Sequence, residues 1–251
     1  MKGLQDKSIV VTGGGSGIGE AVALALGEAG CRVTVADLDG GKAQAVAASI
    51  GQAGGTAQGI AADVADESSV IAMIEAAVRA YGRLDGACNA AGVPQRGKLL
   101  HEVELDEWDR CHAVNLRGLF LCNKYEIRAM LDKGGAIVNI VSTSAMVGFP
   151  NGSEYCASKA GAMGLTRGGA IDYATKGIRI NAVLPGGTLT PMLKGAMEVD
   201  AGLEKALAAV HPMNRFGQPS EIAGAVRWLL SDEASFATGA SFAIDGGHTS
   251  I

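Results

Sequence analysis

The chain has 251 residues, 48% of them hydrophobic and 19% charged, with a net charge of −5. It is long enough to bury a core, and this acidic balance without long blocks of like charge disfavours nucleic acid and anionic membrane surfaces as partners. No apolar run approaches the roughly 18 residues that cross a bilayer, and no signal-peptide pattern opens the sequence. The 5 cysteines are widely spaced, with no Cys-x-x-Cys pair, which favours a reducing compartment. We expect a cytoplasmic protein that acts on a small molecule.

Short β-branched runs alternate with longer segments of helical periodicity along the whole chain. The expected strands are 8–12, 32–36, 56–61, a strand ending at 89, 135–141, 179–184 and 241–244. The expected helices are 18–29, 41–53, 67–81, 104–131, 153–175, 200–209 and 219–230. Parallel strands need helical crossovers, and these cover both faces of the sheet. The sequence therefore predicts one α/β domain over 1–251, a doubly wound Rossmann-type fold with a mostly parallel sheet of about seven strands.

A glycine-rich turn, Thr-Gly-Gly-Gly-Ser-Gly-Ile-Gly, follows the first strand at 12–19 and opens directly into a helix. Glycines let a backbone approach a pyrophosphate closely, and the free N–H groups of a helix start favour its charge. In this strand-to-helix context the turn predicts dinucleotide binding rather than a merely tight turn. No Gly-Lys-Ser/Thr follows, which argues against a nucleoside triphosphatase.

The second strand ends at Asp37, where an acid can accept hydrogen bonds from an adenosine ribose. A carboxylate about 4 Å from a 2′-phosphate would cost on the order of 4 kcal/mol. The nearest basic residues are Arg32 and Lys42, outside the loop. These observations predict NAD as the cofactor rather than NADP, although an ordinary surface-turn aspartate remains an alternative.

The later strands are also followed by small or polar residues. Asp63-Val64 is placed to meet an adenine edge, and Asn-Ala-Ala-Gly at 89–92 suits a ribose. Beyond the fifth strand, Ser142 precedes a helix that carries Tyr155 and Lys159 on one face. A phenol, with an ordinary pKa near 10, needs a nearby positive charge to act as a base. We expect Lys159 and an oxidised nicotinamide to supply it, and Ser142 to hydrogen-bond the substrate oxygen.

Taken together, these motifs resemble the short-chain dehydrogenases/reductases over the whole chain. Matching elements include the turn at 12–19, the Asn-Ala-Ala-Gly at 89–92, Asn115, Tyr-x-x-x-Lys at 155–159, Pro185-Gly186 and Asp245-Gly246-Gly247. The resemblance implies hydride transfer between nicotinamide and a secondary alcohol or ketone carbon, with Tyr155 as general acid/base. It also implies a catalytic tetrad of Asn115, Ser142, Tyr155 and Lys159, in which Asn115 holds a relay water; a simple helix asparagine is the alternative. The expected cofactor residues are Gly13, Ser16, Gly17, Ile18, Gly19, Asp37, Leu38, Asp63, Val64, Asn89, Ala90, Ala91, Gly92, Tyr155, Lys159, Pro185, Gly186, Thr188 and Thr190.

The sequence says less about the substrate pocket than about the cofactor site. By position, the pocket should be lined by Gln95, Arg96, Thr143, Ser144, Met146, Phe149 and a mobile lid at about 188–214. Apolar side chains there suit a cyclic or medium-chain alcohol or ketone, unless they are ordinary core. Glu154 is interpreted as an acid that suits a helix dipole, and the histidines, including His211, as surface or capping residues without metal spacing.

The family resemblance further implies a homotetramer. Two other functions stay open. One is an NADPH-dependent 3-oxoacyl thioester reductase, against which Asp37 argues. The other is a non-catalytic NAD-binding regulatory protein on the same fold.

Overall fold

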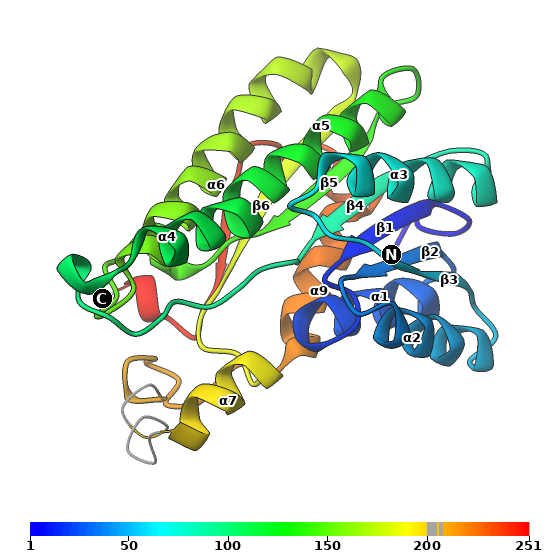
Figure 1. The fold of residues 1–251 in the computed structure, drawn as a ribbon. Helices are drawn as coiled ribbons and strands as arrows, with labels where there is room; N and C mark the ends of the chain where they lie inside the picture. The colour runs from blue at the N-terminus through cyan, green and yellow to red at the C-terminus, as the bar shows by residue number, and fades with distance from the viewer. Residues whose placement is uncertain (200–204, 206–207, 251) are drawn as a thin grey trace.

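The computed structural model describes residues 1–199, 205 and 208–250, and their strands form one parallel sheet (Figure 1). Its seven strands run in the order β3-β2-β1-β4-β5-β6-β7. They are β1 (Ser8–Thr12), β2 (Arg32–Asp37), β3 (Thr56–Ala61), β4 (Gly86–Asn89), β5 (Gly135–Ile140), β6 (Ile178–Pro185) and β7 (Ser241–Ile244). The strand order reverses between β1 and β4, which is the doubly wound topology that the sequence predicted.

Helices cover both faces of this sheet (Figure 1). One face carries α1 (Gly17–Glu28), α2 (Gly40–Gln52) and α9 (Pro219–Leu230). The other carries α3 (Glu67–Tyr81), α5 (Leu119–Met130) and α6 (Ser153–Tyr173). Because both faces are covered, the central strands are buried and mostly apolar, and every residue of β1 is buried. The expected Rossmann-type architecture is confirmed.

The long helix expected at 104–131 is instead three consecutive segments. α4 (Leu105–His112) is followed by a π-helical segment, η2 (Ala113–Gly118), and then by α5. A π-helical turn admits an extra residue and re-aims its side chains, and such turns are common at functional sites. Asn115 lies inside this turn, and apolar periodicity alone does not reveal the change.

The segment after β6 also differs from the expectation. A helix, α7 (Pro191–Val199), begins at Pro191, where a loop was expected. Proline suits the first position of a helix because its missing N–H would have no partner there. Most of the helix expected at 200–209 lies outside the described residues.

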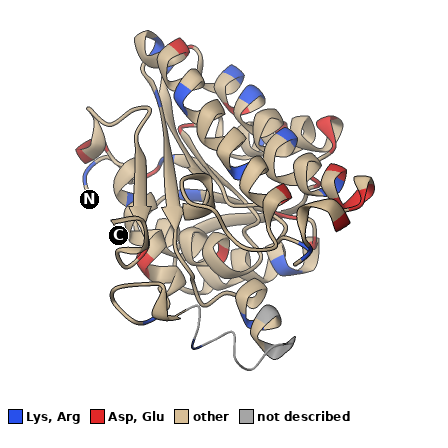
Figure 2. Ribbon diagram, turned by 90° about the vertical axis from the view of Figure 1, so that its left-hand side faces the viewer, with Lys and Arg blue, Asp and Glu red and all other residues tan. Residues whose placement is uncertain are grey.

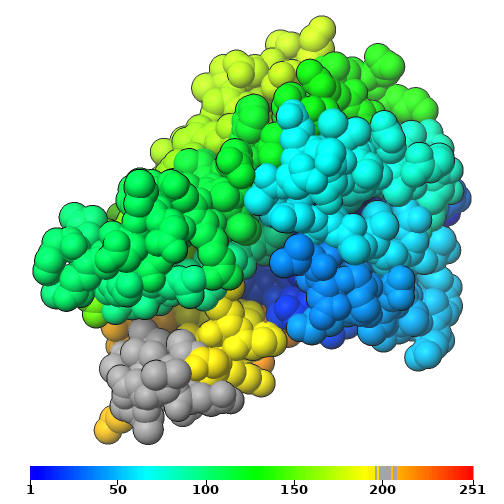
Figure 3. Space-filling model, in the orientation of Figure 1, coloured from blue at the N-terminus to red at the C-terminus, as the bar shows by residue number. Residues whose placement is uncertain are grey.

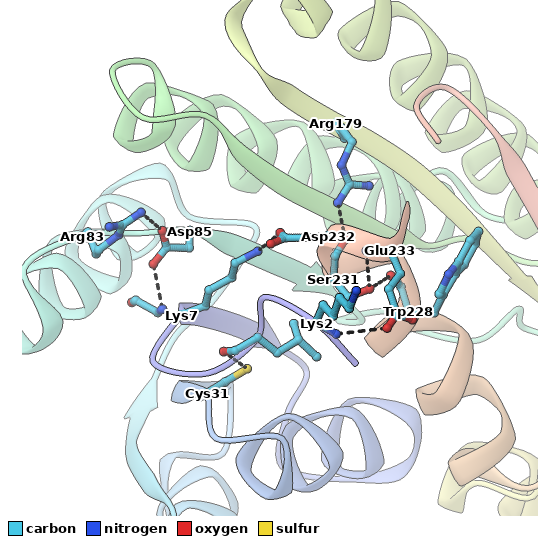
Figure 4. Close-up of polar contacts among 12 residues, drawn as sticks. Lys2, Lys7, Cys31, Arg83, Asp85, Arg179, Trp228, Ser231, Asp232 and Glu233 are labelled. Carbon is cyan, nitrogen blue, oxygen red and sulfur yellow. Dashed lines mark hydrogen bonds and ion pairs between the residues drawn. The ribbon is translucent and has the colours of Figure 1, made fainter. Parts of the chain in front are cut away.

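The amino ends of the strands are fastened by polar contacts (Figure 4). The backbone N–H of Lys2 donates to Glu233 at 3.1 Å, and Lys7 pairs with Asp232 at 2.7 Å. Asp85 accepts from the N–H of Ser8 at 2.9 Å. The first two contacts tie the N-terminal segment to the turn after α9, at the sheet edge opposite the glycine-rich turn, and the third ties the start of β1 to the residue before β4.

Basic and acidic residues are intermixed over the helices, with no single-sign face in the view shown (Figure 2).

Within the described residues, no helix has the length and apolar character to cross a membrane. The same part of the chain contains no group of three or more His, Cys, Asp or Glu side chains arranged to hold a metal ion. All five cysteines are free thiols.

Candidate active site

The cofactor residues expected from the sequence follow the carboxyl ends of strands β1, β2, β3, β4 and β6, apart from Tyr155 and Lys159 on α6. The glycine-rich turn is the tightest part of this edge. Gly13 has φ +63°, and a Cβ there would lie 2.7 Å from the Cα of Ala91. Ser16 precedes α1 with no side-chain capping bond, so its hydroxyl does not cover the first N–H groups of the helix. The turn is thus a glycine cradle at a helix start, which suits a pyrophosphate.

Asp37 is fixed beside this turn by two backbone donors. The N–H of Gly15 donates to its Oδ2 at 2.9 Å, and the N–H of Asp39 donates to its Oδ1 at 3.0 Å. Lys42, on α2, also reaches this place: a Cβ on Gly15 would lie 2.8 Å from the Cβ of Lys42. The Lys42 ammonium lies 3.9 Å from Asp39 Oδ2. Leu38 between these acids is largely exposed. The fold therefore brings Lys42 closer to Asp37 than its place in the sequence suggested.

Asp63 and Val64 occupy the loop after β3. Asp63 is exposed and accepts from the N–H of Ala65 at 2.9 Å, whereas Val64 is buried. A Cβ on Gly118 would lie 2.9 Å from Val64 Cγ2, so this loop packs against the π-helical segment that carries Asn115. The Asp63 loop is thereby held at the sheet edge.

The side chain of Asn89 is buried, and its Oδ1 accepts a long hydrogen bond from the hydroxyl of Thr12, where the glycine-rich turn begins, at 3.5 Å. Its Nδ2 donates to Glu126 Oε2 at 2.9 Å and to Asn139 Oδ1 at 3.1 Å. Asn139 in turn bonds with Asn123 and Thr166. Ala90 and Ala91, by contrast, form the surface against which Gly13 packs. Asn89 thus fixes the carboxyl end of β4 to α5 and β5 in the interior.

Glu126 is the titratable member of this buried cluster. Its side chain is fully buried, and its Oε1 has no hydrogen-bond partner among the residues that the structure describes. Desolvation raises its pKa to about 7, although the bond from Asn89 acts in the opposite direction. Nothing in the sequence marks this glutamate as buried except its position in an apolar helix.

Ser142, Tyr155 and Lys159 converge between β5 and α6. Lys159 is buried, its Nζ donates to the carbonyl of Ile140 at 3.1 Å, and the same Nζ lies 5.6 Å from the centre of the Tyr155 ring. Desolvation lowers the pKa of Lys159 to about 8. Desolvation also raises the pKa of Tyr155 to about 12, and a hydrogen bond with Ser142 opposes this shift. The phenol and the amine therefore both lie in a poorly solvated site.

Asn115 completes the group from the π-helical segment. Its Oδ1 accepts from the N–H of Val93 at 2.8 Å, and its Nδ2 donates to the carbonyl of Val93 at 3.0 Å. A Cβ on Gly92 would lie 3.2 Å from Asn115 Oδ1 and 3.7 Å from Lys159 Nζ. The Asn115 amide therefore holds the loop after β4 against the lysine, and the relay water remains a prediction.

Glu154 is a residue whose burial the sequence did not show. It lies in the first turn of α6, as expected, but it is fully buried, and its Oε1 accepts from the N–H of Arg96 at 2.9 Å. Its Oε2 is buried and has no hydrogen-bond partner within the described part of the chain. Further along the same loop, Lys98 pairs with Glu107 at 2.8 Å. A cavity of about 70 Å³ lies beside Glu154, lined by Val93, Pro94, Arg96, Glu107, Arg110 and Cys111.

The loop after β6 lies against the glycine-rich turn. A Cβ on Gly17 would lie 3.2 Å from Thr190 Cγ2. Thr188 is buried and donates to the carbonyl of Gly186 at 3.0 Å. In the space-filling view the surface is hollowed between the yellow α7, the green α4 region and the blue N-terminal segments (Figure 3). The expected lid at 188–214 begins here, and its residues 200–204 and 206–207 lie outside the described part.

A glycine cradle at the switch point of a doubly wound sheet, with a tyrosine and a buried lysine beside it, defines a class of nicotinamide-dependent oxidoreductases. A family model described as enoyl-(acyl carrier protein) reductase matches residues 13–249. The chain belongs to the short-chain dehydrogenase/reductase family, a family of nicotinamide-dependent oxidoreductases that includes dehydrogenases of CH–OH groups.

Two curated relatives match over nearly their whole length. The chain is 47% identical to a 2,5-dichloro-2,5-cyclohexadiene-1,4-diol dehydrogenase of Sphingobium indicum, covering 100% of both chains. It is 41% identical to a cis-4-hydroxycyclohexanecarboxylate dehydrogenase of Sinomonas cyclohexanicum, covering 98% of each. Among solved structures, levodione reductase aligns with a TM-score of 0.95 at 34% identity, covering 98% of this chain and 99% of the other.

Proposed function

We propose that this protein is an NAD(H)-dependent dehydrogenase that moves a hydride between nicotinamide and a secondary alcohol or ketone carbon. The observation that carries the proposal is the position of Lys159. Its buried amine lies 5.6 Å from the centre of the Tyr155 ring, and a Cβ on Gly92 would lie 3.7 Å from it. These distances support the proposal of an acid/base pair at the sheet edge that carries the glycine cradle.

In this proposal Tyr155 exchanges a proton with the substrate oxygen, and Ser142 hydrogen-bonds the same oxygen as charge develops. Because desolvation holds the pKa of Tyr155 at about 12, the phenolate needs positive charge nearby. Protonated Lys159 provides part of it. When bound, the dinucleotide supplies the hydride acceptor or donor, and its oxidised ring adds a further positive charge. The residues proposed to hold it are those at the strand ends, from Gly13 to Gly19 and from Pro185 to Thr190.

The preference for NAD over NADP rests on Asp37. Its carboxylate is held in place by the N–H groups of Gly15 and Asp39. A 2′-phosphate at this position would meet like charge, at a cost on the order of 4 kcal/mol. The second candidate is an NADPH-dependent 3-oxoacyl thioester reductase, and the similarity to a solved polyketide ketoreductase with NADPH, at 32% identity and a TM-score of 0.94, favours it. A titration with NADH and NADPH separates the two, since comparable affinities would refute the NAD preference.

The proposed substrate class is a cyclic secondary alcohol or the corresponding ketone. Both named relatives act, by their names, on hydroxylated six-membered carbocycles. Met146, which follows the turn after Ser142, is 56% exposed, and Met192 on α7 is 45% exposed. Because neither methionine is core, both are available as an apolar wall.

We also infer that the chain acts as one domain over 1–251 with a lid at about 188–214, as a cytoplasmic homotetramer. Support for assembly comes from exposed apolar side chains on three helices: Leu105 on α4, Phe120 on α5 and Ile171 on α6. Light scattering after gel filtration tests the tetramer, and a monomer would refute it.

The activity is tested by NADH absorbance with cyclohexanol and related cyclic alcohols plus NAD⁺ or NADP⁺. Tyr155→Phe should reduce turnover by about a thousandfold or more while NADH affinity stays unchanged. Tyr173→Phe, near the far end of α6, is the matched control and should retain activity. Retained turnover in Tyr155→Phe would refute the assignment, and NAD⁺ binding without turnover of any alcohol would favour a non-catalytic NAD-binding protein.

A further inference from the structure

A buried histidine lies at the base of the loop that follows β6. His211 is 4% exposed, and its Nε2 accepts from the N–H of Gly187 at 2.9 Å. A Cβ on Gly186 would lie 2.8 Å from the same nitrogen, and the Phe216 ring meets the imidazole edge-on at a centroid distance of 6.3 Å. The expectation that this histidine is a surface or capping residue is therefore wrong.

The direction of this hydrogen bond determines the tautomer of the His211 imidazole. A backbone N–H can only donate, so Nε2 must present its lone pair and the ring proton must be on Nδ1. The His248 ring lies 5.3 Å away, centroid to centroid, but the bond to Gly187 comes from His211.

Gly187 is also bound through its carbonyl. That oxygen accepts from the N–H of Gly217 at 2.9 Å, and the N–H of Leu189 donates to the carbonyl of Gly217 at 2.9 Å. Thr188 pairs with Gly217 as a parallel bridge. Two residues beyond Thr188, Thr190 packs against Gly17 of the glycine-rich turn. Any shift of the Gly187 amide would therefore move the residues that border the cradle.

We propose that His211 is a positioning residue for the nicotinamide cofactor: its Nε2 fixes the Gly187 amide and so holds Thr188 and Thr190 against the glycine-rich turn. The inference rests on the proposed binding of a dinucleotide. His211 acts through the backbone and does not react with the substrate.

A fluorescence titration that measures NADH binding to the full chain tests the proposal. His211→Phe removes the acceptor and leaves the Gly187 N–H buried, which should weaken NADH binding about tenfold. His211→Gln offers a side-chain oxygen to the same N–H and should stay within about threefold of the unaltered chain. His248→Gln, on the neighbouring ring, is the matched control and should bind normally.

Three outcomes would overturn the inference: normal NADH binding by His211→Phe, no rescue by His211→Gln, or an equal loss in His248→Gln. An unaltered chain that binds neither NADH nor NADPH would instead refute the proposed function. A second measurement uses the unaltered chain and so does not depend on whether a variant folds. The ¹⁵N shifts of labelled histidines should show His211 protonated at Nδ1 and not at Nε2, and the reverse tautomer would contradict the hydrogen bond to Gly187.

Discussion

The side-chain amide of Asn115 forms two hydrogen bonds with the backbone of Val93: its Oδ1 accepts from the N–H at 2.8 Å, and its Nδ2 donates to the carbonyl at 3.0 Å. This pair joins the π-helical segment to the loop after β4. Because Gly92, the preceding residue, packs against Lys159, the position of the Lys159 amine depends on this contact.

Asn115→Asp should therefore impair turnover. The aspartate can still accept from the Val93 N–H, but it cannot donate to the Val93 carbonyl, and it adds a charge to a buried site. We expect kcat to fall about a hundredfold, measured as NADH formation. Asn214→Asp, at an exposed turn, is the control. An Asn115→Asp enzyme with normal kcat would show that the Val93 contact is dispensable.

Asp37→Ser should shift the cofactor preference toward NADP. The substitution removes the carboxylate that would repel a 2′-phosphate, while Lys42 stays close to Gly15. The ratio of kcat/KM for NADP⁺ to that for NAD⁺ should rise about a hundredfold or more. Asp39→Asn is the control, since asparagine preserves the cap that Asp39 provides to α2. An unchanged ratio would contradict the role given to Asp37.

Glu154→Ala should weaken substrate binding more than cofactor binding. It removes the acceptor for the Arg96 N–H and so loosens the loop expected to border the substrate. We expect the KM for the alcohol to rise about tenfold at an unchanged KM for NAD⁺. Glu154→Gln keeps an oxygen for the Arg96 N–H and should largely restore the KM. Equal effects of both variants on both KM values would indicate a general loss of structure.

Glu126→Gln should stabilise the fold at neutral and alkaline pH. Because burial raises the pKa of Glu126 from 4.5 to about 7, ionising it destabilises the folded state. That destabilisation is absent below about pH 4.5, grows as the pH rises to about 7 and is constant above, reaching on the order of 3 kcal/mol.

Chemical unfolding at pH 5 and pH 8 measures this effect. Glutamine mimics the protonated acid and can still accept from Asn89, so its advantage should be larger at pH 8. Glu28→Gln, an exposed position on α1, should change the free energy of unfolding little at either pH. A gain that is the same at pH 5 and pH 8 would show that ionisation of Glu126 is not the cause.

The sequence by itself determined the sheet, its helices on both faces and the family. Strand and helix periods alternate clearly, and glycine and polar residues recur directly after the strands. Because the carboxyl ends of parallel strands meet at one edge, the sequence predicts that residues as distant as Gly13 and Tyr155 share one site.

Only the tertiary structure decided which contacts these residues make. The π-helical turn at Asn115, the inward rotation of Asn89 and the burial of Glu154 and His211 all depend on partners far away in the sequence. A glutamate in a first helical turn or a histidine in a loop has the same local pattern whether it faces solvent or binds a backbone N–H. The burial that sets these pKa values and hydrogen bonds arises when the strands and helices pack, so sequence periodicity does not contain it.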